Sequence, residues 1–192
     1  MWALMNEAER RPCWRGRDIA FVPVETDDAE LWQEWRCEPV AAHATGYWPR
    51  SLAALRERIE RDQENQDVDN FLVVRADGTP VGHAALTEQD LADGTADVEL
   101  VLSARHRGRG YGTDALDALT DLAFGELPLH RLQAVTHTDN AAALAVLAKS
   151  GFVQEGVRRS ACLHRGRRHD VAVLALLRPE WEELGRPRAW EL

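Results

Sequence analysis

Segment 95–113 of the chain, TADVELVLSARHRGRGYGT, constrains the fold most, because a strand-like run passes through a glycine- and arginine-rich turn directly into a helix-like one. Glycines let a backbone adopt dihedral angles that other residues avoid and let it come close to a ligand. A helix that begins at once leaves unpaired amide hydrogens and a partial positive charge at its first turn. The turn at 105–112 therefore predicts an anion site, and diphosphate is the usual occupant of such a site.

The spacing of the glycines in this turn can be compared with two other phosphate-binding patterns. The Walker pattern G-x-x-x-x-G-K-[ST] is absent from the chain. The dinucleotide pattern G-x-G-x-x-G is not matched, because Gly108 and Gly110 are followed by Gly112, one position early. Taken alone, the turn also fits a flexible basic loop that binds nothing.

Length and composition indicate the general class of protein. A chain of 192 residues that is 45% hydrophobic fits one soluble domain, which needs neither disulfides nor metal to fold. No apolar run approaches the roughly 20 residues of a membrane span, and the opening residues lack the apolar core of a signal peptide. The three cysteines, Cys13, Cys37 and Cys162, lie far apart without a C-x-x-C pair, which argues against a disulfide framework and a structural zinc site. We therefore expect a cytoplasmic protein with no membrane partner and no metal.

The charge of the chain bears on its partners. It carries 32 acidic and 23 basic residues, for a formal net charge of −9. Affinity for nucleic acid rests largely on neutralised phosphates, so we expect no nucleic-acid partner. A cationic partner fits the charge better, although net charge also serves solubility alone. Lys149 is the only lysine, and heavy use of Arg and Ala is typical of a GC-rich bacterial genome.

Hydrophobic spacing predicts an α+β (α/β-like) fold around a mixed sheet. Ser51 is expected to cap a helix, and Asp77-Gly78 predicts a hairpin turn. We expect an N-terminal extension at 1–16, one domain at 17–184 and a C-terminal tail at 185–192. The expected strands are 18–24, 71–74, 80–87, 95–102, 130–137, 152–161 and 169–177, and the expected helices lie around Trp32 and Trp35 and at 51–63, 113–126 and 140–150.

The turn and the segments after it resemble one known family. R-G-R-G-Y-G at 107–112 matches the R/Q-x-x-G-x-G/A signature of the GNAT superfamily of N-acetyltransferases, and it lies between a strand and a helix, as in that family. Asn140 and KSGFVQEG at 149–156 look like the family's N…x-x-G-F-x-x-E-G segment. Residues 166–181 resemble the RimJ/RimL-type branch, which also includes spermidine acetyltransferases. The resemblance covers residues 17–182.

That resemblance implies a fold and a cosubstrate. It implies a single GNAT-type domain with a mixed, twisted sheet of about seven strands, a central splay and about four flanking helices. Acetyl-CoA would enter the gap between strands 95–102 and 130–137, with its diphosphate on the amides of 107–112. Asn140 matches a family asparagine that contacts the cofactor, and it also suits a helix cap. The implied cofactor-binding residues are Val101, Leu102, Arg107, Gly108, Arg109, Gly110, Tyr111, Gly112, Thr113 and Asn140.

Acetyl transfer to an amine requires a proton acceptor, because the amine is normally protonated near neutral pH. Asp97 and Glu99 lie on one face of a strand, and two neighbouring carboxylates raise one another's pKa, which favours one of them as the base. Asp97 falls where spermidine acetyltransferases have an acidic residue, and Glu99 has the longer reach. The pair could instead be a solvated face that attracts a cationic substrate.

Further candidates surround these carboxylates. His83 and His137 are substitute bases or substrate contacts, because imidazole titrates near neutral pH, although a strand histidine also serves as a packed or surface group. Tyr47 and Trp48 could form the wall of a substrate pocket or anchor their loop by packing.

One position departs from the family pattern. Many GNAT enzymes carry a tyrosine on the helix after the asparagine, as general acid to the leaving thiolate, and this chain has Leu147 there. Direct transfer needs no enzyme nucleophile, so we expect no covalent role for Cys162.

These observations predict an acetyl-CoA-dependent N-acetyltransferase that acts by direct transfer in a ternary complex. The acceptor would be a protein N-terminal amine or a small cationic amine such as a polyamine or an aminated antibiotic. A homodimer is left open. The alternative from another class is a non-catalytic acyl-CoA-binding or sensor domain of the same fold, which the leucine at the tyrosine position would suit.

Overall fold

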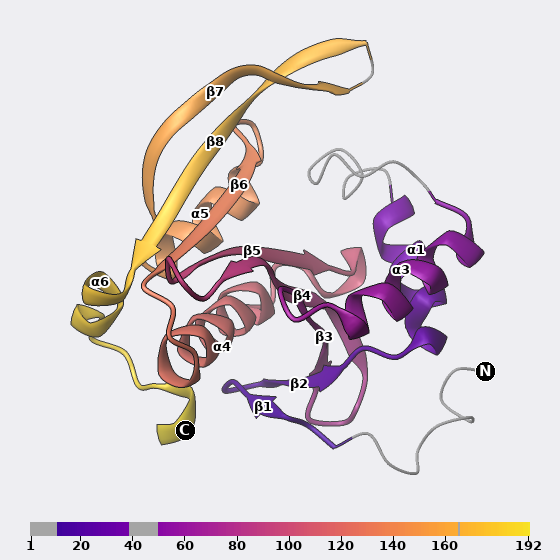
Figure 1. Cartoon of the computed structure of the whole chain (residues 1–192), viewed down its shortest axis with the longest axis horizontal. Helices are drawn as coiled ribbons and strands as arrows, with labels where there is room; N and C mark the ends of the chain where they lie inside the picture. The colour runs from indigo at the N-terminus through magenta and orange to yellow at the C-terminus, as the bar shows by residue number, and fades with distance from the viewer. Residues whose placement is uncertain (1–10, 39–49, 165) are drawn as a thin grey trace.

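Eight strands in the described part of the chain form one mixed sheet, in the order β1-β2-β3-β4-β5-β6-β8-β7 (Figure 1). The computed structural model describes residues 11–38, 50–164 and 166–192. The pairing of β5 with β6 is parallel, and every other neighbouring pair is antiparallel. In chain order the elements are β1 (Trp14–Arg15), β2 (Ile19–Pro23), α1 (Ala29–Cys37), α3 (Leu52–Glu64), β3 (Asp69–Arg75), β4 (Pro80–Asp90), β5 (Thr95–Leu102), α4 (Tyr111–Glu126), β6 (Arg131–His137), α5 (Ala141–Lys149), β7 (Val153–His164), β8 (Arg167–Leu177) and α6 (Arg178–Glu183).

This arrangement confirms the predicted α+β fold, with one strand more than expected. The added strand, β1, lies in the segment predicted as an extension, where Trp14 pairs with Phe21 of β2. The indole Nε1 of Trp14 donates a hydrogen bond of 2.9 Å to the backbone oxygen of Ala118 in α4. Part of the segment before residue 17 is therefore tied to the sheet and to a helix.

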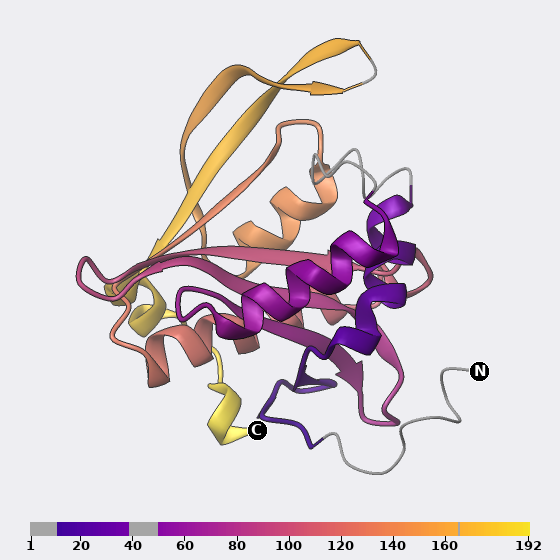
Figure 2. The same ribbon diagram turned by 45° about the vertical axis from the view of Figure 1, so that its right-hand side comes forward.

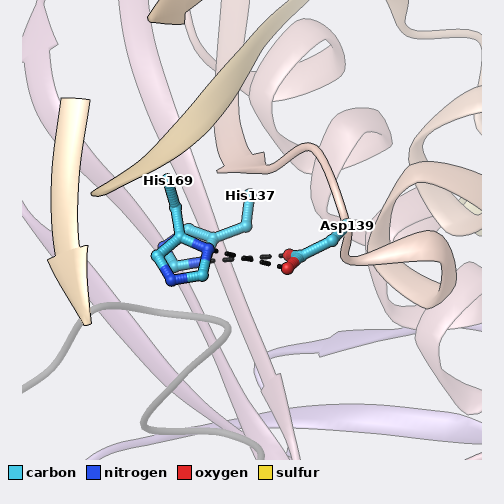
Figure 3. A group of neighbouring side chains, drawn as sticks. All are labelled: His137, Asp139 and His169. Atoms are coloured by element: carbon cyan, nitrogen blue, oxygen red, sulfur yellow. Dashed lines mark ion pairs between the residues drawn. The ribbon is translucent and has the colours of Figure 1, made fainter. Parts of the chain in front are cut away.

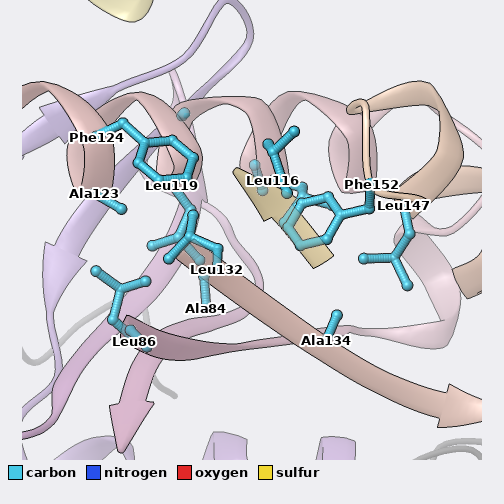
Figure 4. Close-up of a cluster of buried hydrophobic side chains, with 14 of the residues drawn as sticks. Ala84, Leu86, Leu116, Leu119, Ala123, Phe124, Leu132, Ala134, Leu147 and Phe152 are labelled. Atoms are coloured by element: carbon cyan, nitrogen blue, oxygen red, sulfur yellow. The ribbon is translucent and has the colours of Figure 1, made fainter. Parts of the chain in front are cut away.

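Different helices cover the two faces of the sheet. Alternate residues of a strand point to opposite faces, so each strand contributes side chains to both cores. In β3, Leu72 and Val74 join the core under α1 and α3. Phe71 and Val73 join the larger core on the other face, where α4 and α5 pack (Figure 4). Within the described residues, no helix is both long enough and apolar enough to cross a bilayer.

Local signals set the ends of these elements. The hydroxyl of Ser51 accepts a hydrogen bond from the backbone nitrogen of Ala54 and so caps α3, as predicted. Gly78 has a φ of 79° in the turn that joins β3 to β4, a conformation that glycine adopts without strain. The last two strands form a long hairpin that extends beyond the rest of the sheet (Figures 1 and 2).

The C-terminal segment at 185–192 folds back onto α4 around a buried carboxylate. Asp121 is 1% exposed and accepts hydrogen bonds of 2.7 and 2.8 Å from the Arg186 guanidinium. It also accepts bonds from the Trp181 indole at 2.8 Å and from the backbone nitrogen of Ala189 at 2.7 Å. The segment predicted as a tail therefore supplies partners for a buried charge.

Candidate active site

The parallel pairing of β5 with β6 is short. It joins residues 95–97 to residues 131–133, and within the described residues no further pair joins the two strands. β5 continues to Leu102, paired on its other edge with β4. Figure 1 shows β6 rising away from β5 beyond this point. The splay predicted from the resemblance is present, and the edge of β5 along Val98–Leu102 faces the gap.

The glycine-rich turn that follows β5 has open space beside its backbone. Gly108 has a φ of 73° and Gly110 a φ of 89°, both in the left-handed region that favours glycine. Among the described residues, a β-carbon added at either glycine would meet no atom within 4 Å other than those of its chain neighbours. Tyr111 begins α4 directly afterwards, so the unpaired amides and the positive end of that helix lie at the turn. This local geometry is that of an anion site.

Arg107 holds the turn in place through contacts inside the protein. Its Nε donates a hydrogen bond of 3.1 Å to the backbone oxygen of Leu102, and its Nη2 donates one of 2.9 Å to Glu38 Oε2. The guanidinium thus joins the end of β5 to the end of α1. The sequence suggested that Arg107 adds positive charge for a diphosphate, and the structure adds this positioning role. Arg109 is exposed at the same turn.

Asn140 caps α5. Its Oδ1 accepts a hydrogen bond of 3.2 Å from the backbone nitrogen of Ala143, and its Nδ2 donates one of 3.1 Å to Thr136 Oγ1. The capping role considered from the sequence is therefore present. The cap also fixes the Asn140 amide just beyond the end of β6.

Asp97 is the last residue of β5 that pairs with β6, at the point where the two strands part. The carboxylate is half-buried, and its Oδ1 accepts a hydrogen bond of 3.2 Å from Gln133 Nε2. Burial raises the pKa of Asp97 above the usual Asp value, and the bond from Gln133 lowers it in part. The carboxylates of Glu88 and Glu99 raise the pKa by smaller amounts. The sequence attributed the shift to the pair of carboxylates, and the structure makes burial the larger cause.

Glu99 faces the same side and is bound to a cation from α1. Its Oε2 lies 3.5 Å from Nη2 of Arg36, whose side chain is 7% exposed. The Arg36 guanidinium lies 4.7 Å from the ring centroid of Trp32. Because a buried cation balances the charge of Glu99, Asp97 is the stronger candidate for the base.

His83 is a packed histidine. It is 1% exposed, its Nε2 lies 2.9 Å from Asn70 Oδ1, and its ring meets the edge of Trp32 at 4.3 Å between centroids. Burial holds the pKa of His83 well below the usual value, and the charge of Arg36 lowers it further. The predicted substrate contact does not fit this position, because α1 separates the ring from solvent.

His137 lies away from Asp97. It ends β6 four residues beyond Gln133, which at about 3.3 Å per residue is about 13 Å along the strand. Its Nε2 lies 3.0 Å from the sulfur of Cys162. The role predicted for His137 as a substitute base beside Asp97 therefore does not fit the geometry.

The remaining residues singled out from the sequence are Leu147 and the aromatic pair Tyr47 and Trp48. Leu147 is 7% exposed and packs in the larger core with Phe152 (Figure 4). Of the two interpretations of this leucine, core packing is the one that the structure supports. Tyr47 and Trp48 lie outside the described residues.

Sequence reasoning missed three partners of the predicted residues. Gln133 alternates with apolar neighbours in its strand, which places it on a polar face, but its contact with Asp97 depends on the register between two strands. Arg36 lies one helical turn after Trp32, and Glu38 ends the same helix. Their pairing with β5 and with the glycine turn follows from the packing of α1 over the sheet.

Known proteins are similar to this chain in sequence and in fold. Residues 18–153 match the family described as acetyltransferase (GNAT) domain. A probable N-acetyltransferase of Bacillus subtilis, YjcK, is 33% identical over 185 residues, which covers 88% of this chain and 99% of that protein. The spermidine N(1)-acetyltransferase of Escherichia coli K12 is 27% identical over 151 residues, covering 79% of this chain and 75% of that protein. A solved structure of spermidine N-acetyltransferase from Vibrio cholerae, in complex with CoA and spermine, has a TM-score of 0.83 at 20% identity and covers 86% of this chain and 99% of that one.

The splayed sheet and the glycine turn at the start of a helix define an acyl-CoA-dependent transferase fold. The chain belongs to the GNAT acetyltransferase family. Within that family it is an N-acetyltransferase, and acetyl-CoA is its acetyl donor, as the sequence resemblance implied.

Proposed function

We propose that the chain acetylates a primary amine of a small cationic molecule, such as a polyamine. The observation that carries the proposal is the half-buried Asp97 with its raised pKa, at the point where β5 and β6 part. The net charge of −9 and the likeness to enzymes named spermidine acetyltransferases support a cationic acceptor. A protein N-terminal amine is the second candidate, favoured by the resemblance to the RimJ/RimL-type branch.

The side chains and backbone around the gap divide the work of a direct transfer. Asp97 takes a proton from the acceptor ammonium, directly or through one water, which frees the nitrogen lone pair. As the new C–N bond forms, a backbone amide on the unpaired edge of β5 stabilises the charge on the thioester oxygen. Acetyl-CoA supplies an activated acyl group, so no acyl-enzyme is needed. The C–S bond then breaks, and the thiolate takes up a proton from the nitrogen or from water.

An amine panel tests this proposal. The purified chain is incubated with acetyl-CoA and spermidine, spermine, an aminoglycoside or a peptide with a free N-terminus, and the released thiol is measured. We expect thiol release with the polyamines. Release with the peptide alone would move the acceptor to the protein N-terminus. Tight CoA binding without release for any amine would overturn the proposal in favour of an acyl-CoA-binding or sensor domain.

A further inference from the structure

Three side chains with metal-binding groups converge at the end of β6 (Figure 3). His137 is the last residue of β6, Asp139 lies in the turn before α5, and His169 lies in β8. One ligand atom from each lies within 4.8 Å of the other two. Nδ1 of His137 lies 3.9 Å from Asp139 Oδ1, and Nδ1 of His169 lies 3.7 Å from Asp139 Oδ2. Segments far apart in the chain thus present two imidazoles to one carboxylate.

We propose that this cluster binds a zinc ion, with Nδ1 of His137, Nδ1 of His169 and the carboxylate of Asp139 as its three protein ligands. Two imidazoles and a carboxylate are a donor set that Zn²⁺ accepts, and water takes the fourth position in such sites. Donor atoms about 2.0–2.2 Å from one tetrahedral Zn²⁺ lie about 3.3–3.6 Å from each other. The observed nitrogen–oxygen distances of 3.7 and 3.9 Å exceed this range by a few tenths of an ångström.

The neighbouring thiol offers a hydrogen-bond partner to the tautomer of His137 that the site requires. The sulfur of Cys162 lies 3.7 Å from the backbone oxygen of His169 and donates to it. The same sulfur lies 3.0 Å from Nε2 of His137, and it can accept a hydrogen bond from that nitrogen when Nε2 carries the ring proton. A proton on Nε2 leaves the lone pair of His137 on Nδ1, which faces Asp139. Hydrogen bonds of this kind orient metal-ligating histidines and make them better donors.

Within the cluster, the two rings and the carboxylate lie too far apart for direct hydrogen bonds to each other, and the carboxylate is exposed. Nitrogen–oxygen distances of 3.7 and 3.9 Å are longer than the roughly 2.7–3.2 Å of a direct hydrogen bond. The two imidazole rings are stacked, with centroids 5.4 Å apart, so both present an edge in one direction. The Asp139 side chain is 58% exposed, which gives water and an ion a route to the buried His137.

The ion would serve structure or regulation and would lie outside the acetyl-transfer chemistry. His137 is about 13 Å along β6 from Gln133, at about 3.3 Å per residue, and acetyl transfer needs no metal. Its three ligands would join β6, the turn that leads to Asn140, and the long β7–β8 hairpin. Bound zinc should therefore raise the melting temperature, since a ligand that binds only the folded state stabilises it. This inference does not depend on the identity of the acceptor amine.

Calorimetric titration of the full chain with ZnCl₂, after removal of metals by a chelator, tests the site. We expect one Zn²⁺ per chain, a higher melting temperature with zinc, and no such binding of Mg²⁺, which prefers oxygen ligands. Asp139→Asn and His169→Ala should each weaken zinc binding by at least about tenfold. Cys162→Ala should weaken it by about 10- to 100-fold at the same stoichiometry, the usual cost of losing an orienting partner.

His130→Ala provides the matched control, because His130 is an exposed histidine at the opposite end of β6 and should bind zinc as the unaltered chain does. If His169→Ala fails to fold, the exposed position of Asp139 still allows the test with Asp139→Asn. A chain that binds no zinc, or Asp139→Asn and His169→Ala variants that bind it undiminished, would overturn the proposal.

Discussion

Gln133 Nε2 donates a hydrogen bond of 3.2 Å to Asp97 Oδ1, at the last of the three pairs that join β5 to β6. The bond holds the carboxylate at the point where the strands part. The same position half-buries the carboxylate, and burial raises its pKa. The end of the β5–β6 pairing therefore determines the position of the Asp97 carboxylate, its burial and its pKa.

Gln133→Met should shift the dependence of the rate on pH. The hydrogen bond from Gln133 lowers the pKa of Asp97, so its loss should raise that pKa further. A base works only when deprotonated, so the acid limb of kcat/KM should move to higher pH. Gln154→Met on the exposed surface of β7 makes the same chemical change and should leave the profile in place. An unmoved acid limb in a folded Gln133→Met variant would mean that Asp97 is not the titrating base.

Gly110→Glu should weaken CoA binding while the fold survives. The described residues leave open space beside Gly110, so a side chain there should meet a ligand bound at the turn. Like charges about 4 Å apart repel by several kcal/mol near a protein surface, so the loss in affinity should exceed about tenfold. Gly78→Glu is the matched control, because Gly78 also has positive φ and open space, in a hairpin turn. Equal CoA affinity in both variants, measured by calorimetry, would show that the diphosphate of CoA does not bind at this turn.

Leu147→Tyr should destabilise the protein. The larger ring overpacks a filled core, at a cost of about 1–3 kcal/mol. For a chain of this size that cost corresponds to a melting temperature lower by about 2–12 °C. The decrease should be the same with and without CoA, whereas Leu91→Tyr at an exposed turn should melt as the unaltered chain does. An unchanged melting temperature together with altered turnover would place this side chain beside the cosubstrate instead.

Arg186→Ala should also destabilise the chain, by about 3 kcal/mol, because it removes the cation from a buried carboxylate. Asp121 would keep its bonds from Trp181 and from the Ala189 backbone but lose its charge partner. Urea unfolding measures the difference, with the exposed Arg159→Ala as the control. Equal unfolding midpoints would show that the segment at 185–192 contributes little to stability.

Periodicity and turn chemistry predicted much of the fold. The apolar spacing of residues 113–126 matches α4, and Ser51 marked the start of α3 through a bond that depends only on local sequence. Asp77-Gly78 gave the β3–β4 hairpin for the same reason. The splay between β5 and β6 came from the resemblance of the glycine turn to a known family, because no local pattern states where a parallel pairing ends.

The parts that could not be predicted depend on distant residues. His83 interrupts an apolar strand and suggested a functional imidazole, but Asn70 and Trp32 enclose it once α1 packs on the sheet. Arg107 matched its motif, yet its partner Glu38 lies far away in the sequence. Such pairs follow from register and helix packing, which a single sequence does not specify.

Asp97→Asn tests most directly the central claim, that Asp97 is the general base. Turnover, CoA affinity and melting temperature are measured for this variant and for the control Asp93→Asn, which changes an exposed aspartate. Folding raises the pKa of Asp97, so the folded chain loses stability as the pH rises from the usual Asp range through that pKa. Asn carries no such charge, so the variant should melt higher than the unaltered chain at neutral pH and lose this advantage in acid. Its turnover with the best amine should fall by about 100-fold, the usual scale of general-base catalysis, while its CoA affinity stays the same. Full turnover in the Asp97→Asn variant across the neutral pH range would contradict the assignment of this carboxylate as the base.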